Sequence, residues 1–134
     1  MKEGLKRALT MLALLTAVTG AHAQAVDGKA LFAKNCAACH QATGLGIPGA
    51  FPALKGDAFV VGDPAIVIAT VLKGRAGMPS FAASLDDEKL GAILTYVRSA
   101  WGNKGSAVAT ADVATVRSSA SIAPPLHETG TIIH

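Results

Sequence analysis

Two cysteines and a histidine in the segment Cys36-Ala37-Ala38-Cys39-His40 restrict what this chain can form more than any other feature. The Cys-x-x-Cys-His pattern is the attachment signature of a c-type haem, whose vinyl groups bond covalently to both thiols. Cysteines three positions apart can follow the porphyrin edge, and the next residue then points its imidazole at the iron. The chain has no other cysteine among its 134 residues, so no thiol is left for a disulfide or a cluster.

Two other interpretations of a Cys-x-x-Cys pair must be weighed, namely half of a zinc site and a thioredoxin-like redox pair. A zinc site closed by four protein ligands needs a second cluster of ligands, which the sequence lacks. A redox pair is expected in a βαβ setting, and no strand-rich segment surrounds this one. We therefore predict one covalent haem c with its iron, held by Cys36 and Cys39, with His40 as an axial ligand.

Residues 1–23 have the pattern of a secretory signal peptide, in which a positive n-region precedes an apolar stretch and a small-x-small cleavage motif. The apolar stretch covers residues 8–19, which is short of the ~20 residues that span a bilayer. We expect cleavage after Ala23, with Ala25 as the alternative, and no permanent membrane span afterwards. Export to the periplasm also suits a haem whose attachment needs both thiols presented outside the cytoplasm.

Removal of the signal peptide changes the charge balance of the chain. The full sequence carries +3 at pH 7, but residues 1–23 hold three of its 12 basic and one of its 9 acidic residues. The remainder therefore has 9 basic and 8 acidic residues, a net charge of +1. This balance supports no nucleic-acid binding. The remaining length of roughly 110 residues fits a single domain.

The rest of the chain predicts helices joined by two loops that are too rich in glycine and proline to be helical. The predicted helices cover residues 27–34, 64–74, 85–101 and 111–118, and the predicted loops cover residues 41–56 and 74–81. Asp27 and Asp63 are predicted N-caps, and Pro64 suits the first helical position. The 85–101 helix has Asp86 or Ser84 as its N-cap candidate and an apolar stripe with a 3.6-residue period. These features predict an all-α fold.

The C-terminal extension, residues 105–134, is rich in alanine, serine, threonine and valine. We expect one short helix there, capped by Thr110, with Val113 and Val116 facing inward. From Ser119 onward the sequence lacks periodicity, and this part is predicted to be disordered. Truncation after Ser119 is therefore expected to leave haem binding intact.

Met78 is the only methionine that remains once the signal peptide is removed. Methionine in a globular domain is usually a core-filling residue. This one lies in a Gly- and Pro-rich loop, directly before Pro79, which restricts the backbone. A thioether held in this way suits the sixth position of haem iron. The competing ligands, His127 and His134, lie in the predicted disordered tail, so Met78 is the predicted sixth ligand.

With these residues placed, the chain resembles class I monohaem c-type cytochromes over residues 26 to about 103. The resemblance implies an orthogonal helix fold around one covalent haem, in which the first and last helices cross near a right angle. The matching contact positions are Gly28 and Phe32 on the first helix and Ile93 and Tyr96 on the last. Contact at this crossing would explain a glycine inside a helix, which costs up to ~1 kcal/mol relative to alanine.

The resemblance also implies roles around the haem. The carbonyl of Pro52 would accept a hydrogen bond from Nδ1–H of His40, which fixes the ring and raises its basicity as a ligand. Leu54 would pack on the porphyrin. The family's tryptophan that binds a haem propionate has no counterpart here, and the role falls to one of three basic residues: Lys55, Lys73 or Arg75.

Three segments are similar to cytochromes that serve periplasmic or membrane-bound dehydrogenases and to cytochrome domains fused to terminal oxidases: residues 51–56, 77–81 and 94–103. The resemblance implies a soluble periplasmic one-electron carrier that passes electrons from a dehydrogenase to a terminal oxidase or another acceptor. Filled axial positions would leave no site for a substrate, so we expect no enzymatic activity. The alternative is a haem-based sensor or gas-binding protein with a labile methionine ligand.

Overall fold

The computed structural model describes residues 25–120, so the predicted signal peptide, His127 and His134 lie outside the described residues. Within this range the chain forms six α-helices and one 3₁₀ turn, with isolated β-bridges in place of strands. The elements are α1 (Gly28–Asn35), α2 (Ala37–His40), α3 (Ala58–Val61), α4 (Pro64–Lys73), α5 (Asp87–Ser99), η1 (Ala100–Gly102) and α6 (Thr110–Ser119). The all-α prediction is confirmed.

Aspartate side chains begin three of the long helices, as the sequence predicts. The Asp27 carboxylate accepts the Ala30 N–H at 3.0 Å, and that of Asp86 accepts the Lys89 N–H at 2.8 Å. Asp63 caps α4 in the same way. Each cap satisfies a backbone N–H that the helix leaves without a partner, which is why local sequence was sufficient to find these starts.

Three details of the helices differ from the prediction. The short helices α2 and α3, the second of which begins at an Asp57 cap, were not predicted. Thr110 is the first residue of α6 rather than its cap, a position that Ala109 occupies. The helix predicted to reach Trp101 ends at Ser99, and Trp101 adopts a left-handed backbone with φ 54°. The early end of this helix has a tertiary cause, because the Trp101 side chain contacts residues outside α5.

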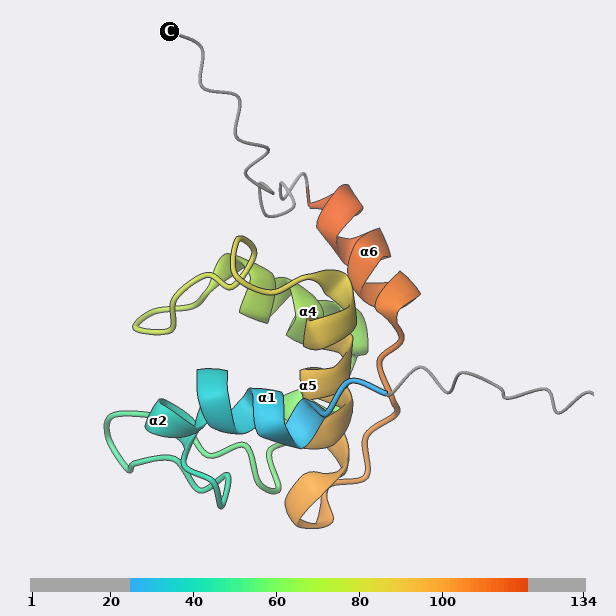
Figure 1. Cartoon of the computed structure of the whole chain (residues 1–134). Helices are drawn as coiled ribbons and strands as arrows, with labels where there is room; N and C mark the ends of the chain where they lie inside the picture. Colours follow the sequence, from blue (N-terminus) through green and yellow to red (C-terminus); the bar gives the residue numbers. More distant parts are fainter. Residues whose placement is uncertain (1–24, 121–134) are drawn as a thin grey trace, which may run out of the picture.

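Helix α1 lies across α5, and glycine permits the close approach (Figure 1). A Cβ at Gly28 would lie 2.1 Å from the carbonyl oxygen of Ala92 and 3.2 Å from Cβ of Tyr96. The Phe32 ring, 2% exposed, lies 5.5 Å from the Tyr96 ring between centroids. The predicted crossing is confirmed, although Ala92 rather than Ile93 faces the glycine.

The core of the described residues lies where α1, α4, α5 and α6 meet. Its buried apolar side chains are Phe32, Val60, Val67, Ile68, Leu72, Leu85, Leu90, Ile93, Leu94, Val97, Val108 and Val113. Val113, on α6, is fully buried, and Val116 packs against the core as predicted. Helix α6 is therefore part of the packed structure. The two loops that carry the predicted haem residues extend together toward the side of the molecule away from α6 (Figure 1).

Two arginines are buried in this core. Arg98, 1% exposed, donates to the carbonyls of Val60 and Gly62 and to both oxygens of Ser106. Arg117, 5% exposed, pairs with the Asp87 carboxylate at 2.7 Å. It also donates to two backbone carbonyls between α4 and α5, those of Ala82 and Leu85, each at 2.8 Å. Each guanidinium thus joins segments that are distant in sequence.

Replacement of Arg117 by leucine is expected to lower the free energy of unfolding by about 2 kcal/mol, the scale of hydrogen bonds to a charged group. The change removes the anchor between α6 and the start of α5. Urea unfolding measures the loss. A chain truncated after Ser119 is the control, because it keeps every contact of Arg117 and should unfold at the wild-type urea concentration. Equal midpoints for the leucine variant and the control would contradict the anchoring role.

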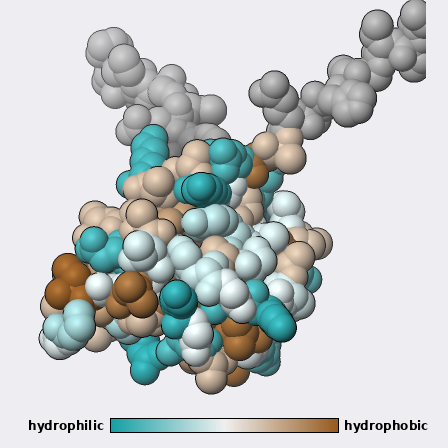
Figure 2. Space-filling view, turned by 90° about the horizontal axis from the view of Figure 1, so that it is seen from below, coloured by the Kyte–Doolittle hydropathy of each residue, from teal (hydrophilic) through white to brown (hydrophobic). Residues whose placement is uncertain are grey.

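No helix among residues 25–120 is long and apolar enough to cross a bilayer. The surface nevertheless carries groups of strongly apolar side chains, seen as separate brown areas from below (Figure 2). The exposed large apolar residues are Leu45, Ile47, Phe51, Phe59 and Ile66, with exposed fractions of 36–56%. Three of the five belong to the loop of residues 41–56.

Candidate functional site

The two cysteines lie at the junction of α1 and α2. Cys36 ends α1, with its N–H donating to the Phe32 carbonyl at 2.8 Å, and it also precedes the first turn of α2. The N–H groups of Cys39 and His40 both donate back to the Cys36 carbonyl. One helical turn therefore carries both thiols and the imidazole. Both sulfur atoms are half-buried and are not joined in a disulfide. Before haem attachment, burial, with a smaller contribution from Cys39, raises the pKa of the Cys36 thiol to about 11.

His40 is almost fully buried, with 9% exposure, and its ring has a defined orientation. Nδ1 lies 2.9 Å from the carbonyl oxygen of Pro52 and can only donate to it. This contact puts the proton on Nδ1 and leaves the Nε2 lone pair available for a metal. Among the described residues no hydrogen bond involves Nε2. The predicted contact between His40 and Pro52 is present.

The loop of residues 41–56 places the Pro52 carbonyl beside His40. The N–H of Gly46 donates to the His40 carbonyl at 2.9 Å, and Ile47 and Phe51 pair across the loop. A Cβ at Gly46 would lie 2.5 Å from the Pro52 carbonyl oxygen, so glycine permits this close approach. Residues 41–54 include no charged side chain, and Leu54 packs against the core. An uncharged loop of this kind fits a flat apolar ligand.

Met78 lies in the second loop, between α4 and α5. Arg75 and Met78 exchange two backbone hydrogen bonds, of 3.1 and 2.9 Å, which make a tight turn. Gly74 has φ +77°, and a Cβ there would lie 2.7 Å from the Met78 carbonyl oxygen. Beyond the turn, the Ser80 hydroxyl donates to the Leu72 carbonyl at 2.5 Å. The half-buried Met78 thioether, the only one among residues 25–120, is thus carried by a well-connected loop.

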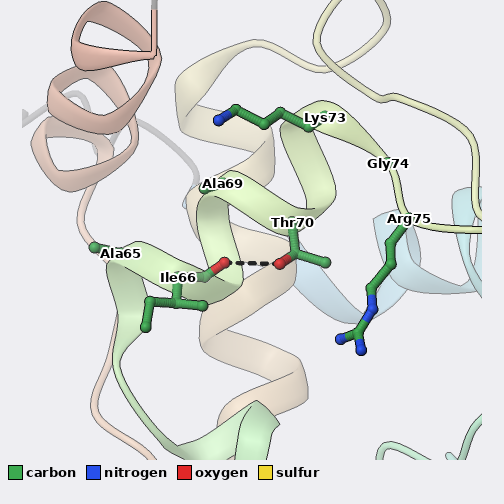
Figure 3. Close-up of a pocket in the computed structure, with 7 residues that line it drawn as sticks. All are labelled: Ala65, Ile66, Ala69, Thr70, Lys73, Gly74 and Arg75. Carbon is green, nitrogen blue, oxygen red and sulfur yellow. Dashed lines mark hydrogen bonds between the residues drawn. The ribbon is translucent and has the colours of Figure 1, made fainter.

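The three basic residues considered for a propionate do not form one cluster. Lys55, Lys73 and Arg75 are all exposed. Lys73 and Arg75 border a shallow hollow on the outer face of α4, where their side chains extend in different directions (Figure 3). The Arg75 guanidinium lies 5.6 Å from the centroid of the Phe59 ring. Among residues 25–120, none of the three forms an ion pair with a carboxylate.

Two residues of the site were not assigned a role from the sequence. Trp101 and Asn103, directly after α5, both bond to the loop that contains Pro52. Asn103 follows Gly102, just beyond the predicted 85–101 helix. An asparagine beside a glycine is common at helix ends, so composition gives no signal for the long-range bonds.

Comparison with known proteins assigns the chain to a family. The profile described as cytochrome c oxidase, cbb3-type, subunit III matches residues 23–97. Cytochrome c-552 of Thermus thermophilus is 36% identical over 115 residues, which cover 74% of this chain and 74% of that protein. The chain therefore belongs to the cytochrome c family with a domain of the cbb3 subunit III type. It carries covalently bound haem c with its iron, and it is not an enzyme.

Two longer relatives show where domains of this kind occur. The cbb3-type cytochrome c oxidase subunit CcoP of Azospirillum brasilense is 37% identical over 90 residues, which cover 61% of this chain and 30% of that protein. The cytochrome c subunit of the quinone alcohol dehydrogenase of Gluconacetobacter polyoxogenes is 30% identical over 105 residues, which cover 69% of this chain and 22% of that protein. This chain thus corresponds to under a third of either relative.

Proposed function

We propose that this chain is a periplasmic one-electron carrier with histidine and methionine as the axial ligands of its haem. The observation that carries the proposal is the 2.9 Å contact between Nδ1 of His40 and the Pro52 carbonyl. It leaves Nε2 free to bind iron and makes the imidazole a stronger donor. When bound, the haem supplies a one-electron couple between ferric and ferrous iron.

Each residue of the site has one task in this proposal. Cys36 and Cys39 hold the haem covalently, and His40 and Met78 fill the two axial positions. Pro52 orients the histidine, and Leu54 packs on the porphyrin. The thioether ligand favours the reduced state and raises the reduction potential. With both axial positions filled, the chain transfers electrons and leaves no place for a substrate.

We propose that residues 24–104 form the cytochrome domain, because they contain all these residues, and that residues 105–134 form an extension. The exported chain begins after Ala23 or Ala25 in this proposal. The donor is a dehydrogenase, and the acceptor is a terminal oxidase or another cytochrome. The printed names of the relatives from Gluconacetobacter polyoxogenes and Azospirillum brasilense, a quinone dehydrogenase subunit and an oxidase subunit, support these two classes of partner.

Three measurements on the exported protein test the carrier proposal. We expect one haem per chain that resists acid–acetone extraction, and a potentiometric titration that follows a single one-electron curve. Carbon monoxide should leave the spectrum of the reduced protein unchanged on mixing, because a bound thioether blocks the iron. Extractable haem would contradict attachment through Cys36 and Cys39. Rapid binding of carbon monoxide would replace the carrier proposal with that of a gas sensor.

A further inference from the structure

The loop of residues 41–56 closes at a neck, formed by Ala42 and Gly44 on one arm and residues 54–56 on the other. The Gly44 carbonyl accepts two hydrogen bonds across the neck, from the N–H of Leu54 at 2.7 Å and that of Lys55 at 2.9 Å. Pro52, whose carbonyl meets His40, lies two residues before Leu54. The position of the Pro52 carbonyl therefore depends on how firmly the neck is held.

Asn103 joins the second arm of the neck to the end of α5. Its side chain is buried, with 8% exposure. Oδ1 accepts the N–H of Gly56 at 2.8 Å, while Nδ2 donates to the carbonyls of Leu54 at 3.0 Å and Val97 at 2.9 Å. Both N–H bonds of the amide and its oxygen are used, so the side chain has one favourable orientation. That orientation ties the loop to the most buried helix of the fold.

Trp101 joins the first arm of the neck to the same turn. Its indole N–H donates to the Ala42 carbonyl at 3.0 Å. Its ring covers Gly44, where a Cβ would lie 2.6 Å from the nearest ring atom. The ring also contacts Phe32 and Tyr96 edge-on, at centroid distances of 5.4 and 5.6 Å. The two arms of the neck are thus held by two residues of one turn.

We infer that Asn103, assisted by Trp101, is a positioning residue for the axial histidine. Asn103 holds Leu54 and Gly56 in place, and the neck in turn holds the Pro52 carbonyl. That carbonyl then sets the orientation of the His40 ring and the strength with which the ring donates electrons to the iron. The inference rests on the proposed function, since it requires His40 to bind the iron. A weaker Nδ1–H bond makes the imidazole a poorer donor, which favours ferrous over ferric iron. Loosening the neck should therefore raise the reduction potential.

The test replaces Asn103 by leucine in the haem-loaded protein. We expect a higher midpoint potential than in the wild type and exchange of the His40 ring N–H with deuterium at least about tenfold faster, equivalent to about 1.4 kcal/mol. Potentiometry and NMR measure the two quantities. If Asn103 had only a structural role, its replacement would change neither the midpoint potential nor the exchange rate as long as the haem ligands stay in place.

Thr95→Val is the matched control. The Thr95 hydroxyl also bridges α5 to backbone, donating to the Val108 carbonyl at 3.2 Å and accepting the Val108 N–H at 2.9 Å. These two bonds connect α5 to the segment before α6 and do not involve the neck. The control therefore loses hydrogen bonds of the same kind, and we expect it to keep the wild-type potential. If Asn103→Leu fails to fold, Trp101→Phe removes the bond to Ala42 and part of the ring that covers Gly44 while keeping an aromatic side chain, and it should raise the potential in the same direction.

The possible failures are distinguishable. Equal potentials and equal exchange rates in Asn103→Leu and Thr95→Val would overturn the positioning role while leaving the carrier intact. The same holds for Trp101→Phe if it replaces the first variant. A wild-type spectrum without histidine–methionine ligation would overturn the proposed function, and one without histidine ligation would overturn this inference as well.

Discussion

Replacement of Met78 by alanine is expected to remove the sixth ligand and convert the ferric protein to a high-spin or water-ligated form. The thioether is the only one among the described residues, and its loop is held by the turn between Arg75 and Met78. Alanine has no atom that can reach the iron. The sulfur-to-iron charge-transfer band of the oxidised wild type should disappear, and the reduced variant should bind carbon monoxide rapidly. Absorption spectra of both oxidation states measure these changes.

Two further variants separate loss of the ligand from disturbance of the loop. Met78→His should restore a six-coordinate spectrum with a lower midpoint potential, because a nitrogen ligand favours ferric iron more than a thioether does. Ser80→Ala removes the hydroxyl bond to the Leu72 carbonyl in the same loop and should keep the charge-transfer band. A missing band in the wild type at neutral pH, together with an unchanged potential in Met78→Ala, would exclude Met78 as the ligand.

Replacement of Gly28 by valine is expected to cost about 3 kcal/mol of folding free energy, the upper end of the usual cost of overpacking. A Cβ at this position would lie 2.1 Å from the Ala92 carbonyl oxygen, so α1 must shift away from α5. The shift would separate Phe32 from Tyr96, whose rings now lie 5.5 Å apart. Denaturant unfolding of the haem-loaded protein measures the loss.

Ala30→Val is the control for Gly28→Val, because it places the same side chain on the exposed face of α1. Valine in an exposed helix costs only a few tenths of a kcal/mol relative to alanine. The control should therefore unfold close to the wild-type midpoint. If both variants unfolded at the same denaturant concentration, the crossing of α1 and α5 would not limit stability.

Local chemistry was enough to predict the starts of α1, α4 and α5. Asp27 and Asp63 satisfy backbone groups within their own first turn, so their role depends on neighbours in sequence alone. The resemblance to known cytochromes added one long-range contact, between His40 and Pro52, and the structure contains it. The roles of Cys36, Cys39, Leu54 and Met78 toward the haem stay predictions.

The buried polar contacts that the sequence did not reveal depend on distant partners. Arg117 looks like an exposed helical residue until Asp87, 30 positions away, is placed beside it. Arg98 lies within the predicted 85–101 helix, and none of its sequence neighbours indicates that it is buried against α3. Asn103 bonds to residues 47 and 49 positions away. Periodicity and capping patterns depend on residues a few positions apart in the sequence. They therefore cannot predict contacts between residues that are 30 or more positions apart.

The left-handed backbone at Trp101 has a consequence for protein engineering. A survey of backbone angles alone would select this position for glycine, because a non-glycine residue held there typically costs about 1–3 kcal/mol. The side chain reverses that choice, because glycine would remove the ring contacts with Phe32 and Tyr96 and would release the Ala42 carbonyl. Attempts to raise the thermal stability of this cytochrome should therefore leave Trp101 unchanged and begin at exposed positions far from the neck.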